Sequence, residues 1–305
     1  IDLAIKKPTL TISDLVFGLA PRINAAGRLG SANDAVKTLI AQNESDGNNK
    51  AGKIHSANKE RRDLDQEITQ EALELIEKYE NHIDLKTSVV YKPDWHKGVI
   101  GIVASRLIET YYRPTIVFTK SEDGLITGSA RSVKGYSVYD AINACSHLLE
   151  KFGGHKYAAG LSLKEENLEE FTRLFEKKVA ETISPELLIP EQVIDAKLSL
   201  SQITNGFYKI LKQFAPFGPG NMRPVFLAEN VLVKYSPKVL KDKHLKMTVF
   251  QPANPTVSFD AIGFDLGIAA DKIDQGVPFD IVFNIDENHW NGNVTKQLLI
   301  KDIRV

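Results

Sequence analysis

The 305-residue chain has one cysteine, two methionines and two tryptophans, and its 38 lysines and arginines nearly balance its 39 aspartates and glutamates. The single cysteine, Cys145, excludes an internal disulfide and indicates a reducing compartment, which we expect to be the cytoplasm. A net charge of −1 excludes a global basic field, so a surface that binds a polyanion must be local. No apolar run approaches the ~20 residues of a membrane span and no signal peptide is visible, so we expect no membrane association.

The N-terminal part is expected to be helical. Residues 1–42 predict short helical pieces around a turn-rich segment at 18–28, and residues 45–80 predict one long helix. The long helix has one narrow apolar stripe, formed by Leu64, Ile68, Ala72, Leu75 and Tyr79. A narrow stripe between two polar sides is typical of a helix that bridges two domains. Because the chain begins without methionine, we expect it to be an internal piece of a longer protein.

Beyond residue 84 the pattern predicts two further regions. From 84 to 183 strands and helices alternate, which favours a mixed sheet covered by helices. The expected strands are 87–92, 114–120, 125–130 and 158–163, and the expected helices are 98–110, 137–151 and 168–183. After Pro190 a short helix at 199–214 precedes five strand-like runs near 225–235, 243–251, 256–264, 279–286 and 294–304. Five short strands separated by turns favour a small barrel such as the OB-fold.

Three glycines and a histidine stand close together at Gly153, Gly154, His155 and Gly160. We expect them in a loop between the helix at 137–151 and the strand at 158–163. Glycines allow close approach of a phosphate, and successive backbone N–H groups in such a loop can bind an anion. The alternative is a tight turn with an internally bonded histidine.

Two other short stretches favour anion binding. Ser129 and Arg131 lie two apart on a predicted strand, so their side chains point to the same side, and both types donate hydrogen bonds to phosphate. The alternative for Arg131 is an exposed salt bridge. His96 precedes a predicted helix start, where backbone N–H groups and the helix dipole favour anions. Its alternative is a capping role beside a packed tryptophan.

Basic residues recur in two further places. Arg22, Asn24 and Arg28 lie in the segment rich in small residues and are expected to be paired internally or to face a polyanion. The barrel carries a basic cluster composed of Lys234, Lys238, Lys241, Lys243, His244 and Lys246. Aromatic residues of the same region are Tyr235, Phe250, Phe259 and Trp290. They either stack on bases of a single strand or fill the barrel core.

Together these stretches resemble the RecJ family of single-stranded-DNA-specific exonucleases, within the DHH phosphoesterase superfamily. The stretches that carry the resemblance are 20–28, 95–107, 128–132, 152–160 and 217–221. The Gly-Gly-His-x-x-Ala-Ala-Gly pattern is shared across the superfamily, whereas the tryptophan–histidine stretch and Phe-Gly-Pro-Gly-Asn are specific to RecJ. The resemblance implies a multidomain α/β-plus-β architecture. Residues 1–83 would be the tail of the DHH domain and a long connecting helix, 84–185 a mixed-sheet DHH-associated domain, and 186–305 an OB-fold barrel.

The resemblance also implies a function for the parent protein, the degradation of single-stranded DNA from 5′ to 3′ with Mn²⁺ or Mg²⁺, in DNA repair and recombination. The aspartate-rich motifs and the Asp-His-His triplet that hold those ions in the family are absent here, and the seven histidines are scattered. We therefore expect this fragment to bind no ion, to contain no catalytic residue and to be inactive alone. Expected partners are single-stranded DNA and a single-stranded-DNA-binding protein or helicase.

Residue roles follow from the same resemblance. Ser129 and Arg131 would hold the terminal phosphate. The other implied substrate contacts are Arg22, Asn24, Arg28, His96, Gly153, Gly154, His155 and Gly160. Lys234, Lys243 and Lys246 would guide the incoming strand.

Two alternatives stay open. The first is another superfamily phosphoesterase, such as an oligoribonuclease or pyrophosphatase, which is disfavoured by the trailing barrel. The second is a non-catalytic single-stranded-nucleic-acid-binding module, which is disfavoured by the conjunction of the small-residue stretch with Ser129 and Arg131.

Overall fold

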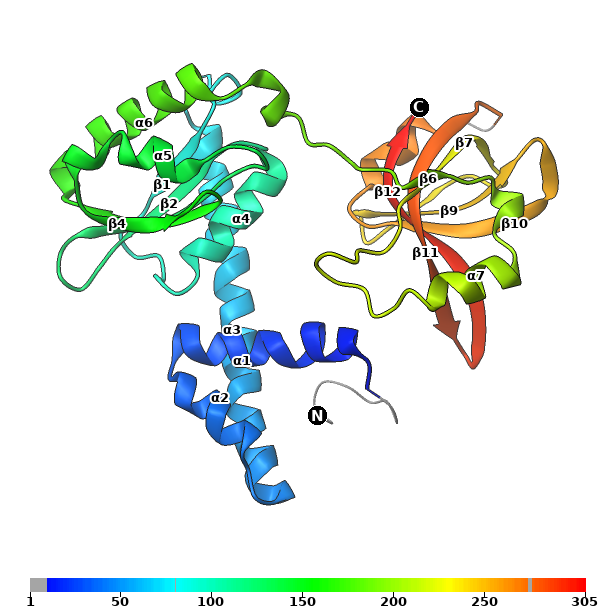
Figure 1. Cartoon of the computed structure of the whole chain (residues 1–305), viewed down its shortest axis with the longest axis horizontal. Helices are drawn as coiled ribbons and strands as arrows, with labels where there is room; N and C mark the ends of the chain where they lie inside the picture. Colours follow the sequence, from blue (N-terminus) through cyan, green and yellow to red (C-terminus); the bar gives the residue numbers. More distant parts are fainter. Residues whose placement is uncertain (1–9, 80, 274–275) are drawn as a thin grey trace. The chain divides into compact units, whose positions relative to one another are not determined.

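The computed structural model describes residues 10–79, 81–273 and 276–305, which divide into two compact units, Ile1–Pro190 and Glu191–Val305 (Figure 1). Each unit has its own hydrophobic core. Phe118 and Phe171 are buried in the first, and Leu245 and Phe283 in the second. In the described part of the chain no helix is long and apolar enough to cross a membrane.

The first unit begins with helices. A π-helical turn at Asp14–Leu19 leads into α1 (Ala20–Leu29), and α2 (Ala32–Leu39) follows. The prediction of a turn-rich segment at 18–28 is therefore wrong. Proline is tolerated in the first helical turn, where its missing N–H has no partner to lose, and the alanines of this stretch favour helix. Ser31 caps α2 by accepting from the N–H of Asn33.

The predicted long helix is present as α3 (Glu44–Glu77), capped by Asn43, which accepts a 2.9 Å hydrogen bond from the N–H of Asp46. Its 34 residues span roughly 50 Å. Its N-terminal half packs on α1 and α2 through Ile54, and its C-terminal half packs through Ile68 and Ala72 on the next helix, α4 (Ile100–Thr110). The helix thus joins the small helical part to the sheet that follows (Figure 1).

A five-stranded mixed sheet forms the centre of the first unit, in the order β1-β2-β3-β5-β4. Its strands are β1 (Ser88–Tyr91), β2 (Thr115–Lys120), β3 (Ile126–Arg131), β4 (Leu149–His155) and β5 (Ala158–Leu163). Only the β1–β2 pair is parallel. α3 and α4 cover one face, and α5 (Val138–Asn143) and α6 (Leu168–Thr182) cover the other (Figure 1).

The prediction of a helix over 137–151 is wrong. α5 ends at Asn143, a 3₁₀ turn occupies Ser146–Leu148, and β4 begins at Leu149. The expected Gly153–Gly160 loop is therefore a β-hairpin, with Lys156 and Tyr157 connecting β4 to β5. Pairing with β5 overrides the local helical pattern, because β4 gains a full ladder of partners, Phe152 opposite Leu161 among them.

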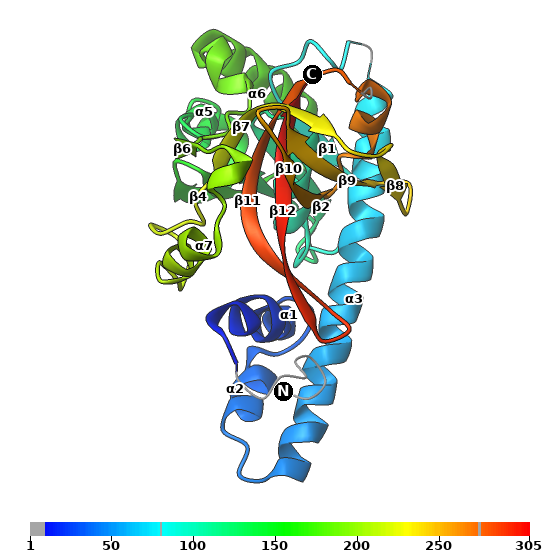
Figure 2. The same ribbon diagram turned by 90° about the vertical axis from the view of Figure 1, so that its right-hand side faces the viewer.

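The second unit is a curled sheet of seven strands in the order β6-β7-β11-β12-β10-β9-β8. Its main strands are β7 (Phe226–Val233), β9 (His244–Gln251), β10 (Asn254–Gly263), β11 (Phe279–Trp290) and β12 (Asn293–Arg304). They confirm the five predicted strands, and β6 (Ala196–Lys197) and β8 (Lys238–Leu240) are additions. β7 also pairs with β9, which curls the sheet toward a barrel. Figure 2 shows β11 and β12 as a long twisted ribbon.

The helix expected at 199–214 is broken into two pieces. A 3₁₀ turn at Leu200–Gln202 precedes α7 (Asn205–Lys212). Thr204 separates them, because its hydroxyl accepts a 3.1 Å hydrogen bond from the N–H of Phe207 and so caps α7.

Candidate functional site

Ser129 and Arg131 lie together on β3, with both side chains on the face covered by α4. Nη1 of Arg131 donates a 3.0 Å hydrogen bond to Oγ of Ser129 and a 2.8 Å bond to the carbonyl of Ala130. A Cβ built on Gly101 would lie 2.9 Å from both Ser129 Oγ and Arg131 Nη2. The pair therefore contacts the first turn of α4, where free backbone N–H groups and the helix dipole favour an anion.

Arg28 belongs to the same site. Its Nη1 donates a 3.1 Å hydrogen bond to the carbonyl of Gly98, just before α4. Gly98 has no room for a side chain, because a Cβ there would overlap the carbonyl of Arg28. The end of α1 is thus held against the start of α4, and Arg28 lies near Arg131 from a distant part of the sequence.

The site carries positive charge that no carboxylate of the described residues compensates. Burial, followed by the neighbouring charge of Arg28, lowers the pKa of Arg131 below its ordinary value. Among the described residues neither arginine pairs with a carboxylate, which rules out the salt bridge considered for Arg131. A half-buried guanidinium beside a second one is unfavourable until an anion binds, so the geometry favours a phosphate.

Two glycines on the neighbouring strands lie in the same cross-strand row as Ser129. Ser129 lies opposite Gly160 of β5, and Gly160 lies opposite Gly153 of β4. Residues directly opposite point to the same face. A Cβ at Gly153 or Gly160 would meet nothing within 4 Å, so packing inside the chain does not require glycine there. The two glycines leave a strip of exposed backbone that another molecule can approach closely.

Gly154 has a different role. Its φ is +154°, and a Cβ there would overlap the carbonyl of Ala158 on β5. The β4–β5 hairpin therefore requires glycine at this position for its own folding.

His96 and His155 are exposed and share one local arrangement. Nδ1 of His96 accepts from the N–H of Gly98 at 3.0 Å, and Nδ1 of His155 accepts from the N–H of Tyr157 at 3.3 Å. In the neutral ring this leaves the Nε2–H free to donate. His155 lies in the same cross-strand row as Arg131, with Ala158 between them, whereas His96 lies in the loop that leads to Gly98.

Two polar anchors that sequence reasoning missed hold this region. Asp65 of α3 is fully buried and accepts two 2.8 Å hydrogen bonds from Arg106 of α4. Glu71 accepts a 2.7 Å bond from the indole N–H of buried Trp95 and also bonds Lys92. Those bonds, the one from Trp95 first, lower the pKa of Glu71. The only signal in the sequence was the unusual density of charge along the long helix.

The other two residues of the N-terminal set lie elsewhere on α1. Arg22 faces α3, where it donates a 3.2 Å hydrogen bond to His55 and lines a small pocket of about 240 Å³ with Arg62 and Asp63. Asn24 is exposed and has no hydrogen-bond partner among the described residues. The structure therefore brings Arg28, and not Arg22, to Ser129 and Arg131.

The second unit carries a separate basic surface on β7–β9. Lys238 of β8 lies directly opposite Lys246 of β9, and Lys234 follows β7 next to Thr248 of β9. These lysines and Lys243 are exposed, and none of them pairs with a carboxylate of the described residues. Like charges directly opposite on a sheet destabilise it, so this surface favours a polyanion.

Aromatic side chains divide between the core and this surface. Phe259 packs against the barrel core, whereas Tyr235 is 63% exposed. Sequence reasoning missed Phe264, which is 58% exposed and has an edge-on contact with His244. The side chain of Trp290 lies outside the described residues.

Metal ligands are not gathered in the described part of the chain: no three histidine, cysteine, aspartate or glutamate side chains there are placed to hold an ion. The described residues thus do not fit a Mn²⁺ or Mg²⁺ site.

The family comparisons define two domains: the DHHA1 domain model matches residues 84–181, and the RecJ OB domain model matches residues 194–302. The chain thus carries a DHHA1 domain followed by a RecJ OB domain. It is 35% identical, over 95% of its length, to the single-stranded-DNA-specific exonuclease RecJ of Bacillus subtilis and covers 36% of that protein. The corresponding RecJ of Escherichia coli is also 35% identical, over 96% of this chain and 52% of its own length.

A solved structure agrees with this assignment. Thermus thermophilus RecJ in complex with Mn²⁺ superposes with a TM-score of 0.78 at 27% identity, over 96% of this chain and 41% of that one. The chain therefore spans roughly a third to a half of the relatives that it matches, 36% and 52% of the two curated proteins above.

Proposed function

We propose that this chain is the substrate-binding portion of a RecJ-like exonuclease that degrades single-stranded DNA from the 5′ end. One observation carries the proposal: Arg131 and Arg28 lie together beside Ser129 with no carboxylate partner among the described residues, next to a strip of exposed backbone. A 5′-phosphate fits this arrangement because it offers several acceptor oxygens to charged donors. The uncovered glycines at 153 and 160 leave room for the adjoining nucleotides.

Each part of the chain has a place in this proposal. Residues 1–83 are the end of a DHH catalytic domain and its connecting helix, 84–185 hold the 5′ end, and 186–305 guide the strand through Lys234, Lys243 and Lys246. His96 and His155 offer further donors on this part of the chain. Asn24 offers an exposed amide on α1, and Arg22 a second basic position there. The RecJ OB match favours this function over an oligoribonuclease or pyrophosphatase.

The parent protein would use Mn²⁺ or Mg²⁺, held by residues that this chain does not contain. This fragment should therefore release no nucleotide on its own. The same proposal places the parent in the cytoplasm, in DNA repair and recombination, with a single-stranded-DNA-binding protein or a helicase as its partner.

The test measures binding of 5′-phosphorylated and 5′-hydroxyl single-stranded oligonucleotides to the whole chain. Arg131→Ala should weaken binding of the phosphorylated end about 10- to 150-fold, the value of a hydrogen bond to a charged group, and should leave the hydroxyl end nearly unchanged. Arg131→Lys should recover only part of the loss, because lysine lacks the planar fork. Arg173→Ala on α6 is the control. An equal loss of affinity for the 5′-phosphorylated and the 5′-hydroxyl oligonucleotide would show that Arg131 does not bind the terminal phosphate.

A further inference from the structure

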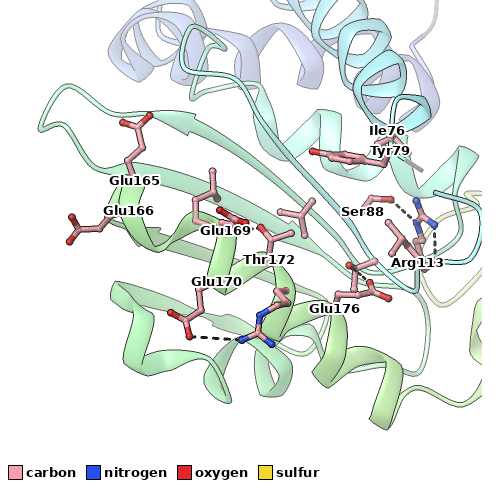
Figure 3. Close-up of a pocket in the computed structure, with 15 residues that line it drawn as sticks. Ile76, Tyr79, Ser88, Arg113, Glu165, Glu166, Glu169, Glu170, Thr172 and Glu176 are labelled. Atoms are coloured by element: carbon pink, nitrogen blue, oxygen red, sulfur yellow. Dashed lines mark hydrogen bonds and ion pairs between the residues drawn. The ribbon is translucent and has the colours of Figure 1, made fainter. Parts of the chain in front are cut away.

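A groove of about 860 Å³ runs along β1, the strand at the edge of the sheet far from β4 (Figure 3). Ile76 at the end of α3 lines one side, and Leu168 and Thr172 of α6 line the other. No residue of the groove belongs to the Ser129–Arg131 site. The volume is large enough for several side chains of a ligand.

The edge of β1 has unused backbone groups at the base of this groove. The N–H groups of Ser88 and Lys92 bond to carbonyls on the β2 side, Pro114 at 3.0 Å and Phe118 at 3.4 Å. Because bonding direction alternates along a strand, the N–H and C=O of Val89 point the other way. Val89 lines the groove, and among the described strands β1 pairs only with β2. An unpaired edge of this kind accepts an added strand.

The groove has an apolar floor and an acidic rim. Ile76, Leu85, Val89 and Leu168 supply apolar surface. The rim is formed by five glutamates, which are Glu165, Glu166, Glu169, Glu170 and Glu176. Figure 3 shows these glutamates along α6 and the turn before it, with Glu166 and Glu169 free of any drawn ion pair. Among the described residues those two have no cationic partner.

The floor also has one unsatisfied donor. Arg113 is buried at 5% exposure and donates to Ser88 Oγ and to the carbonyls of His82 and Leu85. Its Nη2 is buried without a hydrogen-bond partner among the described residues. Buried donors are normally paired, so this Nη2–H lacks the acceptor that such a group usually has.

We propose that this groove docks an extended peptide segment of a partner protein, rich in apolar residues and in lysine or arginine, which adds to β1 as a further strand. Its backbone would bond to the free edge at Val89, and one of its carbonyls would supply an acceptor near Arg113. Alternate side chains would fill the apolar floor and reach the glutamates, as in other cases of strand addition. Nucleic acid does not fit, because its phosphates would face the acidic rim.

The test titrates the whole chain into a fluorescein-labelled peptide of alternating lysine and valine, about nine residues long, a length typical of a strand. Saturable binding is expected, and a glutamate–valine peptide should not bind. The double variant Glu166→Lys/Glu169→Lys should weaken binding about tenfold, since two exposed attractive pairs become repulsive. Its control is Glu109→Lys/Glu181→Lys, which changes the net charge equally at exposed positions outside the groove.

A second peptide tests strand addition without changing the protein. Methylation of alternate amide nitrogens removes the donors that would face β1 and should abolish binding, although the charge is unchanged. Equal binding of the methylated peptide, equal weakening in the control variant, or no binding at about 1 mM would overturn the proposal. A dimer of the chain that Glu166→Lys/Glu169→Lys dissociates would assign the groove to a second copy instead. Arg131→Ala should leave peptide binding intact, so the result is independent of the phosphate site.

Discussion

Arg28 and Gly98 hold the end of α1 against the start of α4 in two ways. Nη1 of Arg28 donates a 3.1 Å hydrogen bond to the carbonyl of Gly98, and the carbonyl of Arg28 occupies the space that a Cβ at position 98 would need. This contact, between residues 70 apart in sequence, places a second guanidinium beside Arg131.

Gly98→Ala should therefore open the junction between α1 and α4. Because backbone must move to admit the methyl group, we expect a loss of about 1–3 kcal/mol in the free energy of unfolding. Binding of 5′-phosphorylated DNA should weaken as well, since Arg28 moves. The control is Gly52→Ala inside α3, where a Cβ meets nothing and a gain of about 0.4–1 kcal/mol is expected. Thermal melting of both variants measures the difference. A melting temperature of Gly98→Ala equal to that of the wild type would contradict the close contact between Gly98 and the Arg28 carbonyl.

Substitutions at the glycines of the β4–β5 hairpin should affect stability at one position and DNA binding at the others. Gly153→Ala and Gly160→Ala place a methyl group in open space, so the melting temperature should stay close to that of the wild type. The methyl groups narrow the approach to the strip beside Ser129, so DNA binding should fall several-fold, about 1 kcal/mol per obstructed contact.

Gly154→Ala is the opposite case. Its φ of +154° and the overlap with Ala158 should lower stability by about 1–3 kcal/mol. If Gly160→Ala bound DNA as well as the wild type does, the bare strip would have no role in binding.

The Glu71–Trp95 hydrogen bond should make stability depend on acid. The pKa of Glu71 is lowered from 4.5, so the folded state favours the carboxylate. The resulting stabilisation is present above pH 4.5 and is lost as the pH falls through the folded value. Glu71→Gln should thus cost roughly 0.5–1 kcal/mol near neutral pH, because the site is partly exposed, and nearly nothing in acid. Denaturant titrations across this pH range test the prediction, with Glu74→Gln as the control. A loss of stability that does not change with pH would show that the charge of Glu71 is not its cause.

The second unit, residues 191–305, should bind single-stranded DNA weakly and without strong sequence preference. If two to four lysines contact phosphates, the log–log salt slope should be about −1.4 to −2.8. Lys238→Gln/Lys246→Gln should reduce its magnitude by about 1.4 without loss of stability, since the two like charges lie opposite each other. Lys197→Gln, which breaks the 2.8 Å pair with Glu229, is the control.

Anisotropy titrations at several salt concentrations, on single strands and on duplex, provide the measurement. Duplex should bind less well, because its bases cannot stack on Tyr235 or Phe264. Equal affinity for both forms would assign the barrel a structural role.

The sequence by itself determined the features that depend on near neighbours. The helix predicted over residues 45–80 matches α3 almost to its ends, and strand alternation predicted that Ser129 and Arg131 share a side. Periodicity succeeds in these cases because each residue's environment repeats along one element.

Only the tertiary structure decided the features that depend on distant partners. The glycine–histidine stretch is a strand because β5 pairs with it, although residues 137–151 suggested a helix. Arg28 lies beside Arg131 and Arg22 does not, because the close approach at Gly98 orients α1. That no described carboxylate lies beside Arg131 was likewise invisible in a chain with 39 acidic residues. Charge pairing is a property of three-dimensional neighbours, and local patterns carry no information about which cation is left without a partner.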